Sequence, residues 1–560
     1  MDIQLANQTI TTNATDCHLT KGGYIAAASL LTLNLPSAPV SYLYSGWQSW
    51  SLAAWVDTDR PVRPMRPSSM HPMQTDPVYA RETRPHGSWY GAVELPNGQT
   101  VFLGALGLES HVMLDRQSLV GWYETGNGEW FLASGDETEI FVRYAELLGE
   151  RFGKGRDAST SVLRQTFGVN AQANAQDLHS APYRVWCSWY SLYTEIYETQ
   201  LLKILNDLDP FDSAQGLPFD VFQVDDGWQV GIGDWEPNAK FPSGMDRLAA
   251  RVKETGRKAG LWLAPLLIVP SSSVYREHRD WLLHDENGKL VSAGFNWGEQ
   301  LYALDTTHPA ALDWLAALMK IVRGWGYDYA KLDFLYAGAL PGKRYVDMPR
   351  EAAYRNGLKV IRAALGEAYF LTCAAPILPS IGLCDGIRVG PDVGETYTSH
   401  RDDDLLMNFA APGVRNALRT TFHRLWLQPL VHTDPDVVYF RSRQNNLTPE
   451  QKSLLQDMAQ ICNFKATSDI PAWLTDSERS ALREFLESRP EVRKTGRTAY
   501  QIGDHEVDFD LHIGMPSQPD KFTNLQGAFI SGLANVPALM KVFDKLGKNS
   551  LKKKLKQNPV

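Results

Sequence analysis

Two segments of the chain place an aspartate where a short apolar run ends. In the first, Tyr329-Ala330-Lys331-Leu332-Asp333, a strand conformation would put Lys331 and Asp333 on one face and Leu332 on the other. A nearby ammonium group favours the ionised form of a carboxyl group, and an ionised carboxylate can act as a nucleophile. The motif therefore predicts a nucleophilic aspartate, with a structural ion pair as the alternative.

The second segment is Gly386-Ile387-Arg388-Val389-Gly390-Pro391-Asp392. Gly390 and Pro391 end the strand and put Asp392 on the loop above it, where partial desolvation would raise its pKa and suit it to proton donation. An aspartate that caps the next helix or turn is the alternative. Together, Asp333 and Asp392 match the two carboxyl groups, about 5–5.5 Å apart, that cleave a glycosidic bond with retention.

A third acidic motif, Asp225-Asp226, follows the apolar run 221–224. Adjacent carboxylates repel each other unless each accepts hydrogen bonds, and sugar hydroxyls are suitable donors. A divalent cation and a helix N-terminus are the alternatives. The cation is the weakest of the three because no histidine-rich or EF-hand pattern accompanies the pair, so we expect no metal ion and no other cofactor.

Short apolar runs alternate with longer helical patterns around these motifs, which predicts parallel strands joined by helices. The predicted strands are residues 184–188, 219–224, 259–264, 329–333, 369–373, 386–389, 429–432 and 466–468. Eight such strands close a (β/α)8 TIM-type barrel, whose active site lies at the carboxyl ends of the strands. A ninth candidate strand, 301–305, is left over.

The remaining chain predicts a multidomain protein. Residues 1–170 are expected to form an N-terminal antiparallel β-sandwich, with strands such as 100–106 and 139–144. Residues 171–182 are expected to be a linker and 183–475 the catalytic barrel. Residues 476–560 are expected to form a small C-terminal appendage, with a strand at 506–512 and an amphipathic helix at 533–546. The lysine-rich tail of this appendage is either a solvated end or a helix for a membrane surface or a partner.

The overall composition excludes several classes of protein. The chain has 55 Lys and Arg against 64 Asp and Glu, and this net charge of −9 argues against nucleic acid as the partner. Five scattered cysteines without a CxxC pair indicate neither a disulfide framework nor a zinc site. We see no signal peptide and no run long enough to span a bilayer. We therefore expect a cytoplasmic protein that has no membrane partner.

Several motifs give the chain a resemblance to the α-galactosidases of glycoside hydrolase family 36, also called melibiases. The matching segments are Trp186-Cys187-Ser188-Trp189-Tyr190, Phe222-Gln223-Val224-Asp225-Asp226, Gly233-Asp234-Trp235, Gly260-Leu261-Trp262-Leu263-Ala264-Pro265, Tyr302-Ala303-Leu304-Asp305, Lys331-Leu332-Asp333-Phe334 and Gly386-Ile387-Arg388-Val389-Gly390-Pro391-Asp392. Their order and spacing agree with the family. The similarity is strongest from about 180 to 440 and vague after 475.

The resemblance implies a retaining exo-α-galactosidase that hydrolyses terminal α-linked galactose from oligosaccharides of the raffinose or melibiose type. It implies Asp333 as the nucleophile and Asp392 as the acid/base. The substrate-binding residues that it implies are Asp225, Asp226, Trp262, Lys331, Cys373, Arg388 and Tyr190. The family also uses a tryptophan of the N-terminal domain, and among Trp47, Trp50 and Trp55 we expect Trp55.

Two departures from the family pattern leave questions open. The chain has Thr372-Cys373-Ala374-Ala375 where the family often has a Gly-Cys-Gly-like segment. It also has His432-Thr433 before Asp434-Pro435-Asp436, where the family tends to have an Asn. His432 is either a core histidine or an extra substrate contact. The alternative functions are an α-galactosyl transferase, an α-N-acetylgalactosaminidase of the same clan, and a carbohydrate-binding protein without turnover. The sequence also leaves open whether the protein forms a homo-oligomer.

Overall fold

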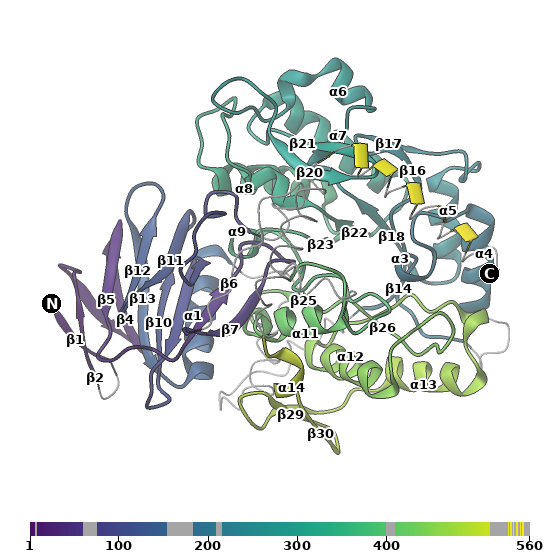
Figure 1. The fold of residues 1–560 in the computed structure, drawn as a ribbon. Helices are drawn as coiled ribbons and strands as arrows, with labels where there is room; N and C mark the ends of the chain where they lie inside the picture. Colours follow the sequence, from purple (N-terminus) through teal and green to yellow (C-terminus); the bar gives the residue numbers. More distant parts are fainter. Residues whose placement is uncertain are drawn as a thin grey trace.

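The computed structural model describes residues 1–5, 8–59, 75–153, 183–208, 216–398 and 409–515, with single positions between 536 and 553. A sheet-rich N-terminal part lies beside a larger part in which strands and helices alternate (Figure 1). The expected linker, 171–182, and half of the residues of the expected helix, 533–546, lie outside the described residues. The domain boundaries there stay predictions.

The larger part contains one parallel sheet. Its strands, in chain order, are β14 (Arg184–Cys187), β15 (Val221–Val224), β18 (Lys258–Leu263), β22 (Tyr329–Leu332), β23 (Tyr369–Thr372), β24 (Gly386–Arg388), β25 (His432–Asp434), β26 (Val437–Val438) and β27 (Lys465–Thr467). β25 pairs with β24, whereas β26 pairs with β27, which in turn pairs with β14. Only Pro435 and Asp436 separate β25 from β26, so they are halves of one interrupted strand. The sheet therefore closes as an eight-stranded barrel, and the expected fold class is confirmed.

The ninth candidate strand lies outside the barrel, and one of the predicted barrel strands needs correction. The ninth candidate, 301–305, corresponds to β21 (Glu299–Ala303), which joins β19 (Leu267–Ile268) and β20 (Ser292–Asn296) in a separate antiparallel sheet. The expected strand 429–432 begins only at His432. The residues before it close a helical turn, since the backbone N–H of Leu430 donates to Leu427 at 2.8 Å.

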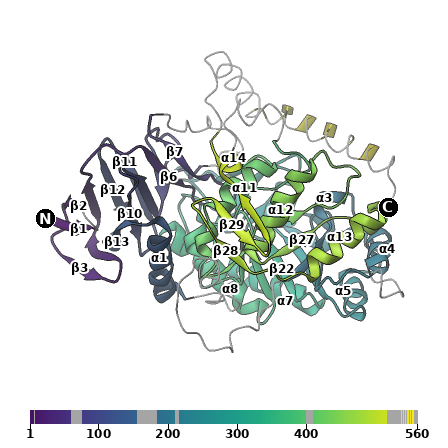
Figure 2. The same cartoon turned by 90° about the horizontal axis from the view of Figure 1, so that it is seen from below.

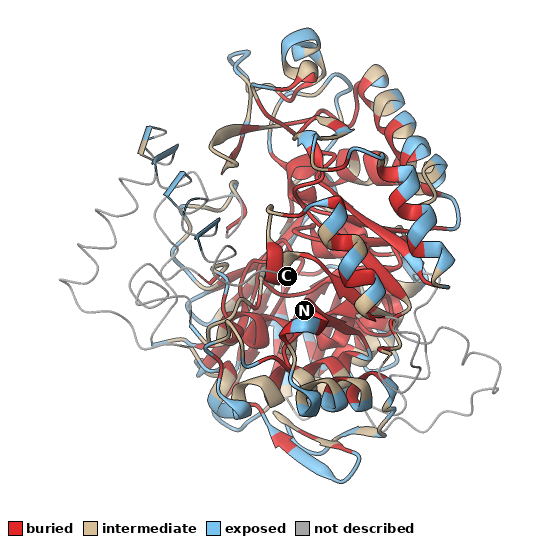
Figure 3. Ribbon diagram, turned by 90° about the vertical axis from the view of Figure 1, so that its right-hand side faces the viewer, coloured by how far each residue is buried: buried red, intermediate tan, exposed pale blue. Residues whose placement is uncertain are grey.

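Helices surround the barrel and cover its strands (Figures 1 and 2). They are α4 (Glu198–Leu208), α5 (Met245–Glu254), α7 (Pro309–Gly324), α8 (Arg350–Leu365), α11 (Val414–Phe422), α12 (Pro449–Cys462) and α13 (Asp476–Glu487). The start of α12 follows from its sequence: Thr448 and Gln451 form a capping box and Pro449 is the first helical residue. Buried residues line the inner sides of the helices, while their outer sides are exposed (Figure 3).

The N-terminal part is built on a single hydrogen-bonded path of mostly antiparallel strands. Their order is β1 (Asp2–Leu5), β2 (Gln8–Thr12), β5 (Leu30–Asn34), β12 (Ser118–Tyr123), β11 (Ser110–Asp115), β8 (His86–Ser88), β6 (Ser41–Ser45), β9 (Tyr90–Glu94), β10 (Thr100–Ala105), β13 (Gly128–Gly135), β4 (Gly23–Ala28) and β3 (Cys17–Thr20), with β7 (Ala53–Asp57) beside β6. An apolar core that includes Leu33, Leu103 and Trp130 lies between strands that are distant in this order.

The stretch 139–144, expected as a strand, is part of a helix, α1 (Glu137–Phe152). Asp136 caps this helix by accepting a hydrogen bond from the backbone N–H of Glu139. Its buried residues, among them Phe141, Tyr144 and Leu148, recur at helical spacing. Because this spacing continues beyond the six residues that suggested alternation, the longer apolar pattern decides the structure.

A buried arginine of the barrel holds a loop of the N-terminal part. The guanidinium of Arg424 donates to the carbonyl oxygens of Gln48 at 3.0 Å and Ser51 at 2.9 Å, and also to those of Gly46 and Ser49. These bonds fix residues 46–51 against the barrel. On the same interface, α1 packs on Trp426, whose ring lies 5.4 Å from that of Phe141.

The C-terminal appendage, expected from residue 476, begins with α13 and continues with three antiparallel strands, β28 (Val492–Lys494), β29 (Ala499–Ile502) and β30 (His505–Asp508). The expected strand 506–512 is only partly correct, since a short helix, α14 (Asp510–Ile513), follows β30. None of the helices in the described residues combines the length and the apolar character needed to cross a membrane.

Charged residues also join the two parts near the start of α8: the buried Asp76, Glu109, Arg350 and Glu351 and the half-buried Glu124. The backbone N–H of Glu109 donates to Glu351 at 2.7 Å, and the backbone N–H of Glu351 donates to the carboxylate of Glu109. Arg350 lies 2.7 Å from Asp76 and 2.8 Å from Glu124. Burial raises the pKa of Glu109 to about 7 and that of Glu351 to about 8.

This cluster should make the stability depend on pH. Because the pKa of Glu351 rises from 4.5 to about 8 on folding, the free energy of unfolding should fall as the pH rises through this range. Glu351→Gln removes the charge and keeps an acceptor for the N–H of Glu109. Urea unfolding across this pH range should show that the free energy of unfolding falls less with rising pH in the variant than in the wild type. The same dependence on pH in both proteins would contradict the assignment.

Candidate active site

Carboxylates gather at the carboxyl ends of the barrel strands, where barrel enzymes have their active sites. Asp225 and Asp226 follow β15, Asp333 follows β22, and Asp392 lies on the loop after β24. The first three are buried, whereas the side chain of Asp392 is 27% exposed. The charge of Asp392 is close enough to raise the pKa of Asp333. The two acids expected to react therefore belong to one site.

Lys331 forms its ion pair with Asp225, not with Asp333 as the sequence analysis assumed. Its Nζ lies 2.9 Å from Asp225 Oδ2, and the two side chains are 8% and 3% exposed. Gln223 donates to the same oxygen at 2.7 Å. The burial of Lys331 disfavours its charge, but Asp225 keeps the pKa of the ammonium group well above its ordinary value. The positive charge still favours the ionised form of Asp333.

Asp226 is held by nitrogen donors. Gln229 Nε2 donates to its Oδ1 at 2.6 Å, and the indole Nε1 of Trp297 donates to its Oδ2 at 2.7 Å. Burial raises the pKa of Asp226 to about 6, and both hydrogen bonds act in the opposite direction. The two neighbouring acids thus differ in environment, because an ammonium group stabilises Asp225 while uncharged donors stabilise Asp226.

Asp333 accepts two hydrogen bonds at the end of β22. Trp262 Nε1 donates to its Oδ2 at 3.0 Å, and the backbone N–H of Phe334 donates to its Oδ1 at 2.7 Å. Phe334 has a φ of 54°, which residues other than glycine rarely adopt. Burial raises the pKa of Asp333, while Lys331 and the hydrogen bond from Trp262 lower it. These contacts fix the orientation of the carboxylate.

Arg388 connects the partly exposed Asp392 to a buried acid, Asp436. Its Nη2 lies 2.9 Å from Asp392 Oδ1 and also pairs with Asp436, in the break between β25 and β26. The hydroxyl of Tyr190 donates to Asp436 as well and lies 3.3 Å from Arg388 Nη2. Burial raises the pKa of Asp436 to about 7, and Arg388 opposes this increase. Arg388, the last residue of β24, therefore orients the side chain of Asp392 on the loop that follows this strand.

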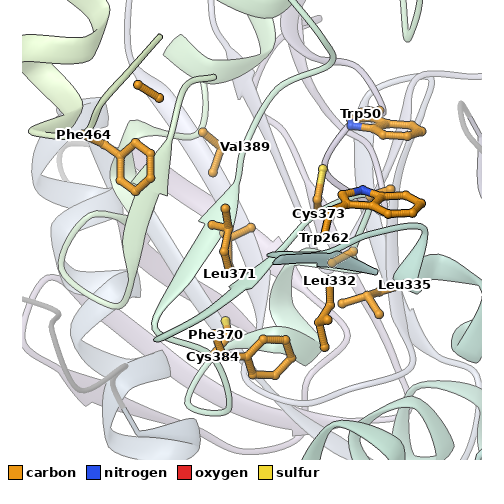
Figure 4. Packing of buried hydrophobic residues seen from close by; sticks show 14 of the residues in the cluster. Trp50, Trp262, Leu332, Leu335, Phe370, Leu371, Cys373, Cys384, Val389 and Phe464 are labelled. Atoms are coloured by element: carbon orange, nitrogen blue, oxygen red, sulfur yellow. The ribbon is translucent and has the colours of Figure 1, made fainter. Parts of the chain in front are cut away.

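Cys373, the first residue after β23, is fully buried near these acids. Burial raises the pKa of its thiol well above the ordinary value, and the charge of Asp333 adds to this increase. The thiol is therefore protonated near neutral pH and unsuited to nucleophilic attack. Figure 4 shows Cys373 with Trp262 and Trp50 in the packing at this end of the barrel.

Trp50, on the loop 46–51 of the N-terminal part, reaches this end of the barrel. The backbone N–H of Ser49 donates to the carbonyl of Ala375 at 3.0 Å, which ties the loop to the segment that follows Cys373. The ring of Trp50 packs edge-on against Phe334, with their centroids 5.2 Å apart. The buried Nε1 of Trp50 has no hydrogen-bond partner among the described residues.

Trp55, which we expected in the pocket, points elsewhere. It lies on β7, where its Nε1 donates to Glu137 at 3.1 Å and the guanidinium of Arg497 covers its ring at 5.0 Å. These contacts place Trp55 against α1 and against the loop between β28 and β29 of the C-terminal sheet. His432 likewise lies at the amino end of β25, where it contacts Tyr369, and so behaves as a packing residue.

Sequence reasoning missed two residues of the site, Trp297 and Asp436, and chose Trp55 over Trp50. The position of Trp50 depends on the interface between the N-terminal part and the barrel, and no local sequence pattern predicts that interface. Trp297 lies between two short strands in Asn296-Trp297-Gly298, a turn sequence whose large aromatic residue was a usable signal. Asp436 belongs to Asp434-Pro435-Asp436, where the proline already marks an interrupted strand.

The fold and the site define a (β/α)8-barrel protein of the glycoside hydrolase class, and comparisons with known proteins identify its family. The Melibiase family model matches residues 176–364. TtGalA, an α-galactosidase from Thermus thermophilus solved with p-nitrophenyl α-D-galactopyranoside, is 42% identical, with a TM-score of 0.82 over 91% of this chain and 99% of that chain. The chain belongs to the α-galactosidases of glycoside hydrolase family 36.

Other relatives match shorter parts. The α-galactosidase AgaA of Geobacillus stearothermophilus is 28% identical over 190 residues, which are 31% of this chain and 24% of that protein. Mel36A of Lactobacillus acidophilus is 30% identical over 228 residues, 38% of this chain and 28% of that protein. The match thus spans about a quarter of the length of these curated relatives. The AgaA structure, 16% identical with a TM-score of 0.51 over 83% of this chain and 64% of that chain, supports the fold alone.

Removal of one partner of the ion pair between Lys331 and Asp225 should destabilise the protein. Lys331→Met leaves Asp225 buried and unpaired, which should lower the free energy of unfolding by about 3–5 kcal/mol. The double variant Lys331→Met/Asp225→Asn should lose less than Lys331→Met alone, because it removes the uncompensated charge. Urea unfolding at neutral pH measures both, and additive losses would contradict a direct ion pair.

Proposed function

We propose that the protein is a retaining exo-α-galactosidase, with Asp333 as the nucleophile and Asp392 as the acid/base. The observation that carries the proposal is the contrast between these two acids at one barrel end. Asp333 is buried and fixed by Trp262 and Phe334, as a group that must attack one carbon atom requires. Asp392 is partly exposed and held by Arg388, so it can exchange protons with water.

The proposed reaction has two displacements. In the first, an oxygen of Asp333 forms a bond to the anomeric carbon while the bond to the leaving oxygen breaks, and Asp392 gives its proton to that oxygen. In the second, Asp392 takes a proton from water, the water oxygen bonds to the anomeric carbon, and the Asp333 carboxylate leaves. The two displacements restore the original anomeric configuration and return both acids to their starting states.

The substrates proposed are oligosaccharides with terminal α-linked galactose. TtGalA has been solved with p-nitrophenyl α-D-galactopyranoside and with stachyose, and its similarity to this chain supports the same class of substrate here. Asp225, Asp226 and Lys331 supply the charged groups for the sugar hydroxyls. Trp50, brought in by the N-terminal part, narrows the site and favours removal of terminal residues. Transfer of galactose to a sugar acceptor is the second candidate, since it uses the same first displacement.

Replacement of Asp333 tests the assignment of the nucleophile. Asp333→Ala should lose at least about 10³-fold in kcat on p-nitrophenyl α-D-galactopyranoside, because no covalent intermediate can form. Azide should restore turnover and yield β-galactosyl azide. Asp328→Ala is the matched control, since Asp328 precedes β22 at the opposite end of the barrel and pairs with Lys253 and Arg323.

Asp392→Ala separates the second role from the first. Azide should rescue this variant as α-galactosyl azide, because the Asp333 intermediate still forms and azide then replaces it. The same azide anomer from both variants, or full activity of Asp333→Ala, would contradict the assignment.

A further inference from the structure

Trp297 lies at the tip of a hairpin that reaches the candidate site from outside the barrel. β20 and β21 pair so that Asn296 faces Glu299, which leaves Trp297 and Gly298 as a two-residue turn. Both have positive φ, 52° and 79°, as in the type I′ turns that usually carry Asn-Gly. A bulky residue with this backbone is strained and persists only where its surroundings hold it.

The contacts of the indole identify what holds it. Its Nε1 donates to Asp226 Oδ2 at 2.7 Å, which is a charge-assisted hydrogen bond when Asp226 is ionised. Its ring centroid lies 5.2 Å from that of Phe334 and 6.2 Å from that of Trp262, the two residues that donate to Asp333. Trp297 therefore contacts a sugar-binding acid and the neighbours of the proposed nucleophile at once.

We propose that Trp297 is a positioning residue for galactoside binding, which fixes the Asp226 carboxylate through Nε1 and closes the site with its ring. This inference rests on the proposed function. Gln229 and Trp297 hold one oxygen of Asp226 each, so together they set the plane of the carboxylate. The lone pairs that remain face the sugar hydroxyls. Without the indole N–H, the Asp226 carboxylate would be free to rotate, and it would be protonated at a higher pH than in the wild type.

Trp297→Phe keeps an aromatic ring and removes the donor. Its matched control is Trp235→Phe, because the buried Trp235 packs 6.1 Å from Trp262 but its Nε1 makes no hydrogen bond with any described residue. Trp297→His restores a ring N–H donor. We expect Trp297→Phe to lower kcat/KM on p-nitrophenyl α-D-galactopyranoside about 10- to 100-fold, mainly through KM, as the loss of a hydrogen bond to a charged group predicts.

The acid limb of the pH profile gives a second readout. The hydrogen bond from Trp297 lowers the pKa of Asp226, which burial raises to about 6. Its loss should therefore move the acid limb of kcat/KM to higher pH in Trp297→Phe, but not in Trp235→Phe, with partial return in Trp297→His. A folded fraction that is the same at every pH lowers kcat/KM uniformly and leaves the position of this limb unchanged, and circular dichroism across the pH range measures that fraction.

Binding of D-galactose, measured by calorimetry on the same proteins, separates this inference from the proposed function. Wild-type protein that binds galactose without turnover would contradict the proposed function, and the affinities of the variants would then decide the role of Trp297. Turnover by the wild type with equal effects of Trp297→Phe and Trp235→Phe on KM and on the acid limb would overturn the inference.

Discussion

The candidate site is governed by the repulsion among carboxylates that lie close together in a buried place. Within the described part of the chain, Asp225, Asp226, Asp333, Asp392, Asp434 and Asp436 lie at the same barrel end, where the counter-charges are Lys331 and Arg388. Two cations cannot neutralise six acids. The acids without a cationic partner must be stabilised by neutral N–H donors, or be protonated more easily because their pKa values are raised.

This constraint explains why tryptophans surround the site. An indole supplies an N–H donor together with a large apolar surface, so it can stabilise a carboxylate and shape a sugar pocket with one side chain. Trp262 does so for Asp333 and Trp297 for Asp226. Trp50 adds a third ring through the loop that Arg424 holds. The N-terminal part is thereby a component of the site, because its placement decides where Trp50 lies.

The sequence predicted the elements that follow from periodic patterns. Apart from 429–432, the barrel strands appear at the expected places, and Asp225, Asp226, Asp333 and Asp392 follow their carboxyl ends, because a parallel strand and the acid that ends it are both local features. The apolar pattern of 139–144 was too short to distinguish a strand from α1, and 301–305 has the pattern of a strand but joins another sheet.

Contacts between distant segments could not be predicted in the same way. Lys331 is two residues from Asp333 in the chain but pairs with Asp225, 106 residues away, because β22 and β15, on either side of β18, bring their carboxyl ends to the same end of the barrel. The choice of Trp55 over Trp50 failed for a related reason. The loop 46–51, which carries Trp50, is held against the barrel by bonds that it makes with Arg424, Ala375 and Ile377, all far away in the chain.

The most direct test of the account is the anomeric configuration of the sugar when it is first released. Proton NMR during hydrolysis of p-nitrophenyl α-D-galactopyranoside resolves the two anomers before they interconvert. Two displacements through Asp333 predict that α-galactose appears first and that the β anomer follows only by mutarotation. Initial release of β-galactose would mean a single displacement by water and would contradict the role assigned to Asp333.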